Sequence, residues 1–224
     1  DRLKKKYKTL QGALNASPAY LNNKNLRITL ETNTTEDVYI SGFTSGAVRI
    51  YFNGKTIYGY VGGYANSATV YIYGGTADDT TASRGVIHPN TGLDLGTRCV
   101  SAGFEACQYV ALYKIKVFGA DNKPSSVSSK YKVAVASSAG TGSIYCSDVE
   151  VTNCAIGFRA NNMGCIHGAK TSGVASRYAF EALTGGQISL ADATQAGGTT
   201  ANTSKNNGGQ VWYNSPTFAT GSTS

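Results

Sequence analysis

LRITL (26–30) opens a series of short apolar segments that decides the fold. In this segment Leu26, Ile28 and Leu30 alternate with polar residues, which predicts a β-strand with one buried face. Similar segments follow at DVYI (37–40), AVRIYF (47–52), KTIYGYV (55–61) and TVYIY (69–73). The separators are rich in Gly, Asn, Ser and Thr, and strands recur roughly every 8–12 residues, as in a β-sandwich, a β-barrel or a β-solenoid.

Two features favour the β-solenoid among these architectures. Several predicted strands are only three to five residues long, too short to wrap a closed barrel but suited to the short faces of a coil. The cysteines also repeat, because Cys99 to Cys107 and Cys146 to Cys154 are both steps of eight. In a solenoid, such small residues would stack in buried ladders from coil to coil. We therefore predict an all-β solenoid.

A second repeat in the latter half points the same way. The Gly-Phe-X-Ala pattern of GFEAC (103–107) recurs in GFRAN (157–161). Residues 120–130, ADNKPSSVSSK, are the best candidate for a loop between coils. Residues 194–224 begin with a low-complexity stretch of Gly, Thr and Asn, and we expect them to form a turn-rich C-terminal segment after a β-solenoid over 21–193.

Composition supports a turn-rich all-β protein. Of the 224 residues, 41% are hydrophobic and 15% are charged, against the usual charged fraction of about 25%. Gly (27) and Tyr (15) are abundant, which suits tight turns and strands respectively. No apolar stretch is long enough to cross a membrane, so we expect no membrane insertion.

The net charge of +7 arises mostly at the N-terminus. The first eight residues supply five cations and one anion, and the cations are Arg2, Lys4, Lys5, Lys6 and Lys8. We interpret 1–6 as a basic, solvated lead-in and do not expect nucleic acid as a partner. No signal peptide follows it, and both ends of the chain look abrupt, as in a fragment of a longer protein.

The five cysteines predict free thiols and no metal site. Their number is odd, which argues against a secreted disulfide framework and favours folding in a cytosol. Their spacings of 8, 39, 8 and 11 do not match the closely spaced pairs of zinc sites. We expect no metal and no cofactor.

Residues 7–20, YKTLQGALNASPAY, predict one short amphipathic helix. Tyr7, Leu10 and Leu14 fall on one helical face, and the Asn15–Pro18 region stops the pattern. We expect this helix to cap the first coil, with Leu10 and Leu14 facing the interior.

Residues 7–40 also carry a family resemblance. YKTLQGALNASP, LRITL and EDVYI in succession resemble the opening of pectin-methylesterase-like parallel β-helices, in which a helix with an F-x-T-I-Q-x-A-I motif plugs the first coil. ISGFTSGAVRIYFNG (40–54) is similar to the continuation found in bacteriophage tail proteins of this kind, as are Asn153-Cys154 and GGQI (185–188). The resemblance implies a right-handed parallel β-helix with an N-terminal capping helix.

The esterase chemistry of that family does not carry over. The aspartates of its Q-D-T and D-F-I-F-G contexts and its Arg-Pro-Trp motif are absent, and the single tryptophan is Trp212. Asp78 and Asp79 lie in a loop context, GGTADDTT. Glu36 and Asp37 match the acidic pair of the opening motif.

Asp148 and Glu150 in CSDVEV form the strongest enzyme signal. They alternate with Val149 and Val151, so both should point outward from one strand, about 6.5–7 Å apart. Glycan hydrolases use two carboxylates at such separations, but outward strand positions are polar in any case. Cys165 and His167 share a strand face without a third orienting group, and His88 precedes a proline, so neither histidine predicts catalysis.

Tyrosines alternate with aliphatic residues along several strands. If the aliphatic residues face the core, these tyrosines face outward, where they suit packing against a neighbouring subunit or stacking on sugars. We favour subunit packing over glycan binding. The tyrosines concerned are Tyr39, Tyr51, Tyr58, Tyr60, Tyr71 and Tyr73.

Three functions remain open on the sequence. The first is a non-catalytic shaft or spike segment of a phage tail fibre, tailspike or baseplate, made in the bacterial host cytoplasm and assisting host adsorption in the virion. Its partners would be copies of itself, as a homotrimer, and other tail or baseplate proteins. The second is a module that binds host cell-wall or capsule glycan. The third is a polysaccharide depolymerase using Asp148 and Glu150.

Overall fold

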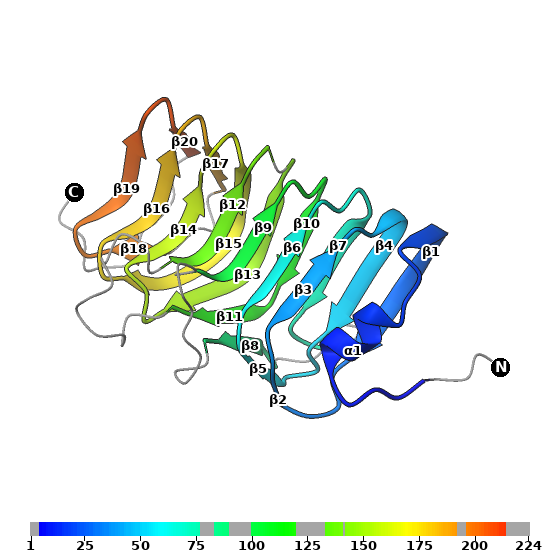
Figure 1. Cartoon of the computed structure of the whole chain (residues 1–224). Helices are drawn as coiled ribbons and strands as arrows, with labels where there is room; N and C mark the ends of the chain where they lie inside the picture. The colour runs from blue at the N-terminus through cyan, green and yellow to red at the C-terminus, as the bar shows by residue number, and fades with distance from the viewer. Residues whose placement is uncertain are drawn as a thin grey trace.

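The computed structural model describes residues 5–76, 83–89, 100–119, 133–140, 142–191 and 196–213. These residues form one short helix and twenty strands, and every pair of neighbouring strands is parallel. The prediction of an all-β protein is confirmed. Figure 1 shows the strands stacked along one axis, with the N-terminus and α1 at one end and the C-terminus at the other.

The strands form two sheets of thirteen and seven strands. The larger sheet has two arms that meet at the long strand β13. Its first arm contains β1 (Tyr20–Thr29), β4 (Thr44–Tyr51), β7 (Thr69–Tyr73), β10 (Val110–Tyr113), β13 (Ile144–Thr152), β15 (Cys165–Ala175), β17 (Gln187–Leu190) and β20 (Gln210–Tyr213). Its second arm contains β2 (Thr34–Thr35), β5 (Thr56–Tyr58), β8 (Gly85–His88) and β11 (Ile115–Phe118), and β18 (Gly197–Gly198) pairs with the end of β15.

The smaller sheet takes the remaining strands. They are β3 (Val38–Ser41), β6 (Val61–Tyr64), β9 (Val100–Glu105), β12 (Val133–Ser138), β14 (Ile156–Ala160), β16 (Tyr178–Leu183) and β19 (Ala201–Asn206). Along the chain, one pass visits the first arm, the second arm and the smaller sheet in that order, and the next pass lies directly beside it. Parallel neighbours therefore come from successive passes.

The register between passes follows a step of 22 or 23 residues. Ile144 pairs with Ile166, which pairs with Ile188, a step of 22 each time. Val38 and Val61 pair at a step of 23. Two steps are longer, 40 residues from Val70 to Val110 and 34 from Val110 to Ile144, and these contain most of the residues that lie outside the described ranges.

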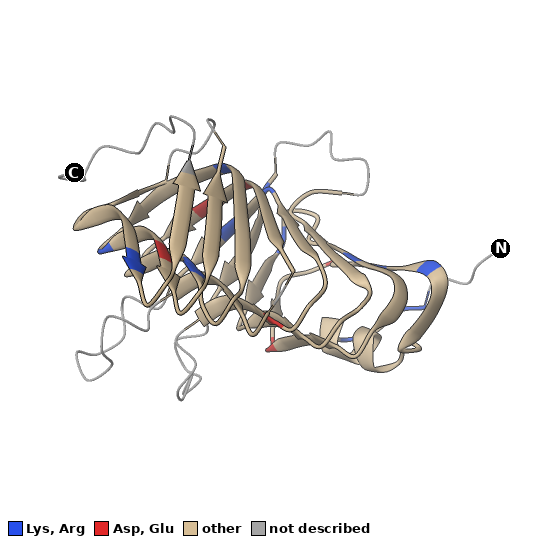
Figure 2. Cartoon of the chain, turned by 90° about the horizontal axis from the view of Figure 1, so that it is seen from above, with Lys and Arg blue, Asp and Glu red and all other residues tan. Residues whose placement is uncertain are grey.

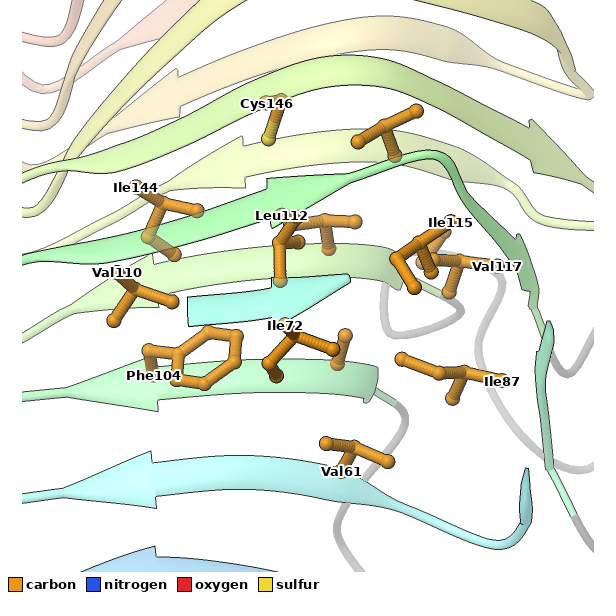
Figure 3. Packing of buried hydrophobic residues seen from close by; sticks show 14 of the residues in the cluster. Val61, Ile72, Ile87, Phe104, Val110, Leu112, Ile115, Val117, Ile144 and Cys146 are labelled. Carbon is orange, nitrogen blue, oxygen red and sulfur yellow. The ribbon is translucent and has the colours of Figure 1, made fainter. Parts of the chain in front are cut away.

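The hydrophobic core runs between the sheets along the whole stack. Inward residues of successive passes lie in register, so that each aliphatic side chain contacts the equivalent one above and below it (Figure 3). One such ladder on the first arm is Val48, Val70, Val110, Ile144, Ile166, Ile188 and Val211, all of them buried. Each fully buried side chain of this size contributes about 1.5–3 kcal/mol.

The corners between the smaller sheet and the first arm use left-handed backbone. Asn162 and Met163 both have positive φ, as do the corner residues Thr184-Gly185 and Asn207-Gly208 of the next two passes. The glycine that follows is required by space, because a Cβ on Gly186 would lie 2.2 Å from the Ala160 carbonyl oxygen of the preceding pass. Asn and Gly tolerate this conformation, which explains why these corners are rich in them.

Helix α1 (Leu10–Asn15) is shorter than the predicted 7–20. Thr9 is its N-cap and accepts from the backbone N–H of Gly12, so Tyr7 lies before the helix and is exposed. Pro18 is incompatible with further helix, and β1 already begins at Tyr20. Leu10 and Leu14 are buried in the core as predicted.

The two sequence repeats that we predicted are corrected by the positions of their residues in the strands. The Cys steps of eight do not mark coils, because Cys146 lies in β13 whereas Cys107 and Cys154 lie in different corners, after β9 and before β14. The two Gly-Phe-X-Ala motifs do not stack in register, because Phe104 lies level with Ala160 rather than with Phe158.

The turn-rich segment that we predicted from residue 194 also continues the sheets. β18, β19 and β20 pair with β15, β16 and β17. The low-complexity residues supply corners and outward positions, while Ala196 and Val211 face the core. The expected loop at 120–130 and Asp1–Lys4 of the basic lead-in lie outside the described residues. In the described ranges no helix is long and apolar enough to span a bilayer.

Candidate functional site

Asp148 and Glu150 lie on the outward side of β13, as the alternation predicted. Val149 and Val151, which alternate with them, are fully buried. Asp148 has a φ of 57°, and the pairing of β13 with β15 shifts register around Ser147, so the strand bulges here. The bulge places the Asp148 side chain beside cations from other passes.

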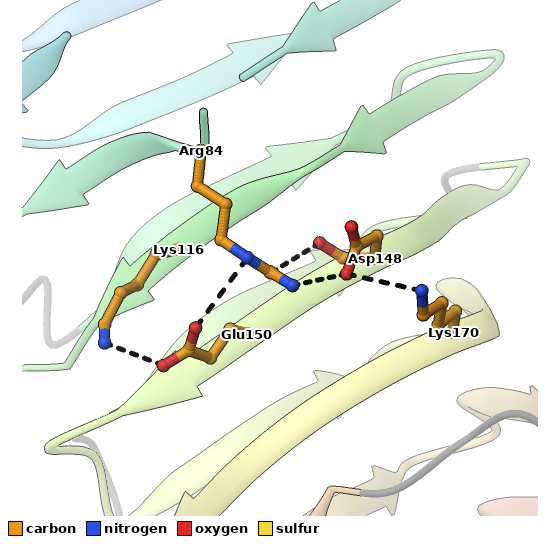
Figure 4. A network of polar contacts seen from close by, with 5 residues as sticks. All are labelled: Arg84, Lys116, Asp148, Glu150 and Lys170. Carbon is orange, nitrogen blue, oxygen red and sulfur yellow. Dashed lines mark hydrogen bonds and ion pairs between the residues drawn. The ribbon is translucent and has the colours of Figure 1, made fainter. Parts of the chain in front are cut away.

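These two carboxylates belong to a charged cluster with Arg84, Lys116 and Lys170 (Figure 4). Arg84 Nη2 lies 2.5 Å from Asp148 Oδ1, and Arg84 Nη1 donates to the Asp148 carbonyl oxygen at 2.9 Å. Arg84 Nε lies 3.9 Å from Glu150 Oε2, and Lys116 Nζ lies 2.7 Å from Glu150 Oε1. Lys170 Nζ is 3.9 Å from Asp148 Oδ1.

The cluster links four successive passes, and its carboxylates are not free. Arg84 immediately precedes β8, Lys116 lies on β11, and the two acids lie on β13 between them and Lys170 of β15. The carboxylate oxygens that a glycan hydrolase would direct at a glycosidic bond are here bound to neighbouring cations. The arrangement therefore fits lateral cross-linking of the second arm better than acid–base chemistry.

The six predicted tyrosines divide among three places. Tyr51, Tyr71 and Tyr73 lie on the outward face of the first arm. Tyr58 lies on the second arm, where its ring is 5.8 Å from that of His88, which in turn is 4.6 Å from Phe118. The six tyrosines therefore do not form one group, because Tyr58 lies on the second arm and two others lie at the smaller sheet.

Tyr39 and Tyr60 lie at the smaller sheet. Their ring centroids are 5.5 Å apart, and the Tyr60 hydroxyl donates to the Gly103 carbonyl oxygen at 2.8 Å. Tyr39 and Tyr58 are each about two-fifths exposed, as expected for contact residues. The Tyr60 hydroxyl, by contrast, is used within the chain.

The first arm carries an aromatic column that consists of Tyr51, Tyr73, Tyr113, Tyr145 and His167. Successive ring centroids are 5.0, 5.2, 5.8 and 5.4 Å apart. The rings of Tyr51, Tyr73 and Tyr113 are nearly parallel, at interplanar angles of 9° and 8°. Each ring in this part therefore covers the face of the next.

This stacking corrects the expectation that Tyr51 is exposed. Its side chain faces outward, but the residue is only 3% exposed because Tyr73 and its other neighbours cover it. Sugar stacking requires a free ring face. Within the parallel part of the column, only the partly buried Tyr73 and Tyr113 can present ring edges and hydroxyl groups to a ligand.

Burial raises the pKa of Tyr73, Tyr109 and Tyr113, and neighbouring tyrosines add to this effect. The Arg49 charge acts in the opposite direction on the pKa of Tyr73 and Tyr113. Because the net shift is upward from an already high value, these phenols stay neutral around pH 7 and can donate hydrogen bonds.

The histidines and cysteines do not gather into a metal-binding group in the described part of the chain. His167 Nδ1 lies 2.6 Å from Ser189 Oγ and its ring stacks on Tyr145, so it belongs to the aromatic column. Cys107, Cys146 and Cys154 are buried thiols, whereas the Cys165 thiol is partly exposed. No three His, Cys, Asp or Glu side chains gather to bind a metal there. Asp78, Asp79 and Cys99 lie outside the described residues.

Sequence reasoning missed Arg84, Tyr113 and Tyr145 as members of these groups. A 22–23-residue repeat would have aligned them, and the clearest trace of it is GGQISL (185–190) followed by GGQVWY (208–213). The long steps through Val110 hide that repeat in the middle of the chain, where these three residues lie.

Comparison with known proteins identifies no relative. No family model matches the chain, and neither the curated proteins nor the solved structures contain a match. The geometry of the chain itself therefore carries the functional argument.

Proposed function

We propose that this chain is a right-handed parallel β-helix that serves as a shaft or spike segment of a bacteriophage tail fibre, tailspike or baseplate. The observation that carries the proposal is the axial stacking of parallel passes, with a core extending from Leu10 to Val211. Each pass pairs with its neighbours through parallel strands in both sheets. Such a stack resists bending and suits a load-bearing element.

The outward features support a structural role. The charged cluster and the aromatic column both tie neighbouring passes together. At the N-terminal end, α1 covers the core beside β3, and Gln11 pairs with the backbone of Tyr39 at the edge of that strand. Covering a sheet edge in this way prevents uncontrolled strand addition.

Assembly with copies of itself, as a homotrimer, and with other tail or baseplate proteins belongs to the same proposal. Tyr39 and Tyr58 are exposed aromatic side chains on two different sides of the stack, and aromatic residues are enriched at protein interfaces. In the virion, the segment would assist host adsorption after synthesis in the bacterial cytoplasm.

The proposal is tested by locating the chain in a particle. An antibody raised against the purified chain is used to label phage particles that encode this sequence, and the particles are imaged by negative-stain electron microscopy. We expect label on the tail or baseplate. Label confined to the capsid, or to no part of the particle, would overturn the proposal.

A further inference from the structure

Arg27 and Arg49 lie side by side next to the aromatic column. They are direct partners in the pairing of β1 with β4, and both face outward. Arg49 is in turn the partner of Tyr71 on β7, and its guanidinium carbon lies 4.8 Å from the centre of the Tyr71 ring. Figure 2 shows Lys and Arg on the strands nearest the N-terminus.

The charge of these two arginines is not balanced within the described structure. β1, β4, β7 and β10 contain no Asp or Glu, whereas they contain Lys24, Arg27 and Arg49. Neither arginine forms an ion pair with a described residue. The two arginines occupy paired positions on neighbouring strands, so an anion that contacts both would be bound favourably.

One side-chain atom of Arg49 also lacks a hydrogen-bond partner among the described residues. Its Nε is buried and has no hydrogen-bond acceptor among the described residues. Buried polar atoms in folded proteins nearly always have partners, and a bound ion or water is one explanation for an exception. The side chain is held in place by the Tyr71 ring.

We propose that Arg27 and Arg49, together with the hydroxyl groups of Tyr73 and Tyr113, form a binding site for an anionic glycan. The arginines bind its carboxylate or phosphate group, and the neutral phenols donate hydrogen bonds to its oxygens. This site goes beyond the proposed shaft function and does not depend on it, because a shaft needs no such ligand.

The geometry of the aromatic column favours a glycan over single-stranded nucleic acid as the ligand. Nucleobases bind by stacking on free aromatic faces. The parallel rings from Tyr51 to Tyr113 cover one another's faces, so the partly buried Tyr73 and Tyr113 offer hydroxyl groups instead. Two hydroxyl groups beside two cations match a polymer that is rich in oxygen and negatively charged.

The site is tested with the intact chain by fluorescence polarisation of labelled polymers at low salt. The probes are polygalacturonate, which carries carboxylates, polyglycerol phosphate, which carries phosphates, neutral dextran, and single-stranded DNA. We expect saturable binding of polygalacturonate or polyglycerol phosphate, weakened by added salt, and no binding of dextran. The tighter of the two anionic probes identifies the acidic group.

Variants assign the binding to these residues. Arg27→Gln alters an exposed side chain, and Arg49→Gln removes the stacked cation; each should weaken binding about tenfold. Arg49→Lys should restore part of it. Arg177→Gln is the matched control, because the Arg177 guanidinium carbon lies 5.0 Å above the Tyr178 ring, away from this site. Circular dichroism and thermal melting confirm that each variant is folded.

Three results would overturn the site. The first is no binding of either anionic glycan by the wild-type chain. The second is binding by Arg27→Gln and Arg49→Gln that is as tight as binding by the wild-type chain, or a loss of affinity in Arg177→Gln as large as theirs. The third is binding of single-stranded DNA as tight as that of the anionic glycans.

Discussion

The carboxylate of Glu36 accepts the backbone N–H of Leu10 at 2.9 Å, across 26 residues of sequence. Its second oxygen accepts the N–H of Gln11 at 2.9 Å, and the Thr34 hydroxyl donates to the first at 2.7 Å. The first-turn N–H groups of α1 have no partner within the helix, so Glu36 satisfies two of them. Glu36 of the opening motif thus holds the helix on the first pass, whereas Asp37 accepts the Tyr60 backbone N–H.

Replacing Glu36 with Ala should destabilise the chain by about 1–2 kcal/mol, because two N–H groups lose their acceptor. Urea unfolding followed by circular dichroism measures the change. Glu31→Ala is the matched control, since Glu31 is exposed in the preceding connection, between β1 and β2, and should change stability by less than about 0.5 kcal/mol. Equal effects of the two substitutions would show that Glu36 does not hold the helix.

Replacing both Leu10 and Leu14 with Asp should cost several kcal/mol. Both side chains are 3% exposed, and burying each contributes about 2–3 kcal/mol before the cost of placing a carboxylate there. We expect a lower melting temperature and aggregation through the uncovered core. A soluble double variant with an unchanged melting temperature would show that α1 is not a cap.

The fold was predictable because inward positions must be apolar in every pass. Val48 and Ile50 alternate with Arg49, and the same period of two recurs in strands such as β7, β11 and β17. The helix was also visible, but its ends were not. They depend on the Thr9 cap and on Pro18, whose effects a helical-face pattern does not resolve.

The surface groups were only partly predictable because they depend on the register between passes. Arg84 and Asp148 are 64 residues apart in sequence, and they meet because longer connections intervene between β7 and β13. Tyr51 faces outward as expected, but its burial depends on the aromatic residues of the next passes. The alternation of apolar and polar residues predicts on which face of the sheet a side chain lies, but it does not predict which residues of other passes lie beside it.

Removing one member of the Arg159–Glu181 ion pair should destabilise the chain, whereas replacing both with apolar residues should change its stability little. Arg159 Nη2 lies 2.6 Å from Glu181 Oε2, with side chains 14% and 10% exposed. Arg159→Met leaves the Glu181 carboxylate poorly hydrated without this cation, and we expect a loss of about 3 kcal/mol. The double variant Arg159→Met, Glu181→Leu should return to within about 1 kcal/mol of wild type.

Urea unfolding of the two singles and the double gives the coupling energy for this pair. Lys170→Met is the exposed comparison, because the Lys170 side chain is 64% exposed and 3.9 Å from Asp148; it should cost less than about 0.5 kcal/mol. Additive losses in the Arg159 and Glu181 variants would contradict a coupled, partly buried pair.

The thiols should differ sharply in reactivity. In a Cys99→Ser background, we expect one accessible thiol, Cys165, while Cys107, Cys146 and Cys154 react only on unfolding. Burial raises the pKa of both Cys165 and Cys146, so the thiolate fraction of Cys165 at pH 7 is below that of a free cysteine, and its reaction should accelerate as pH rises towards its pKa. Ellman titration counts the thiols, and fast labelling of two or more in the folded protein would contradict this burial.

Asp148 and Glu150 should act as structural counter-ions without catalytic turnover. Incubation of the chain with a panel of bacterial capsular and cell-wall glycans should release neither reducing ends nor unsaturated uronates. Asp148→Asn keeps a residue that tolerates the positive φ, and Glu150→Gln keeps the side-chain shape. Because these ion pairs are partly exposed, each substitution should cost only about 1 kcal/mol or less. Turnover by the wild-type chain that disappears in either variant would identify the charged cluster as the active site of a depolymerase, with Arg84 and Lys116 as groups that position its carboxylates.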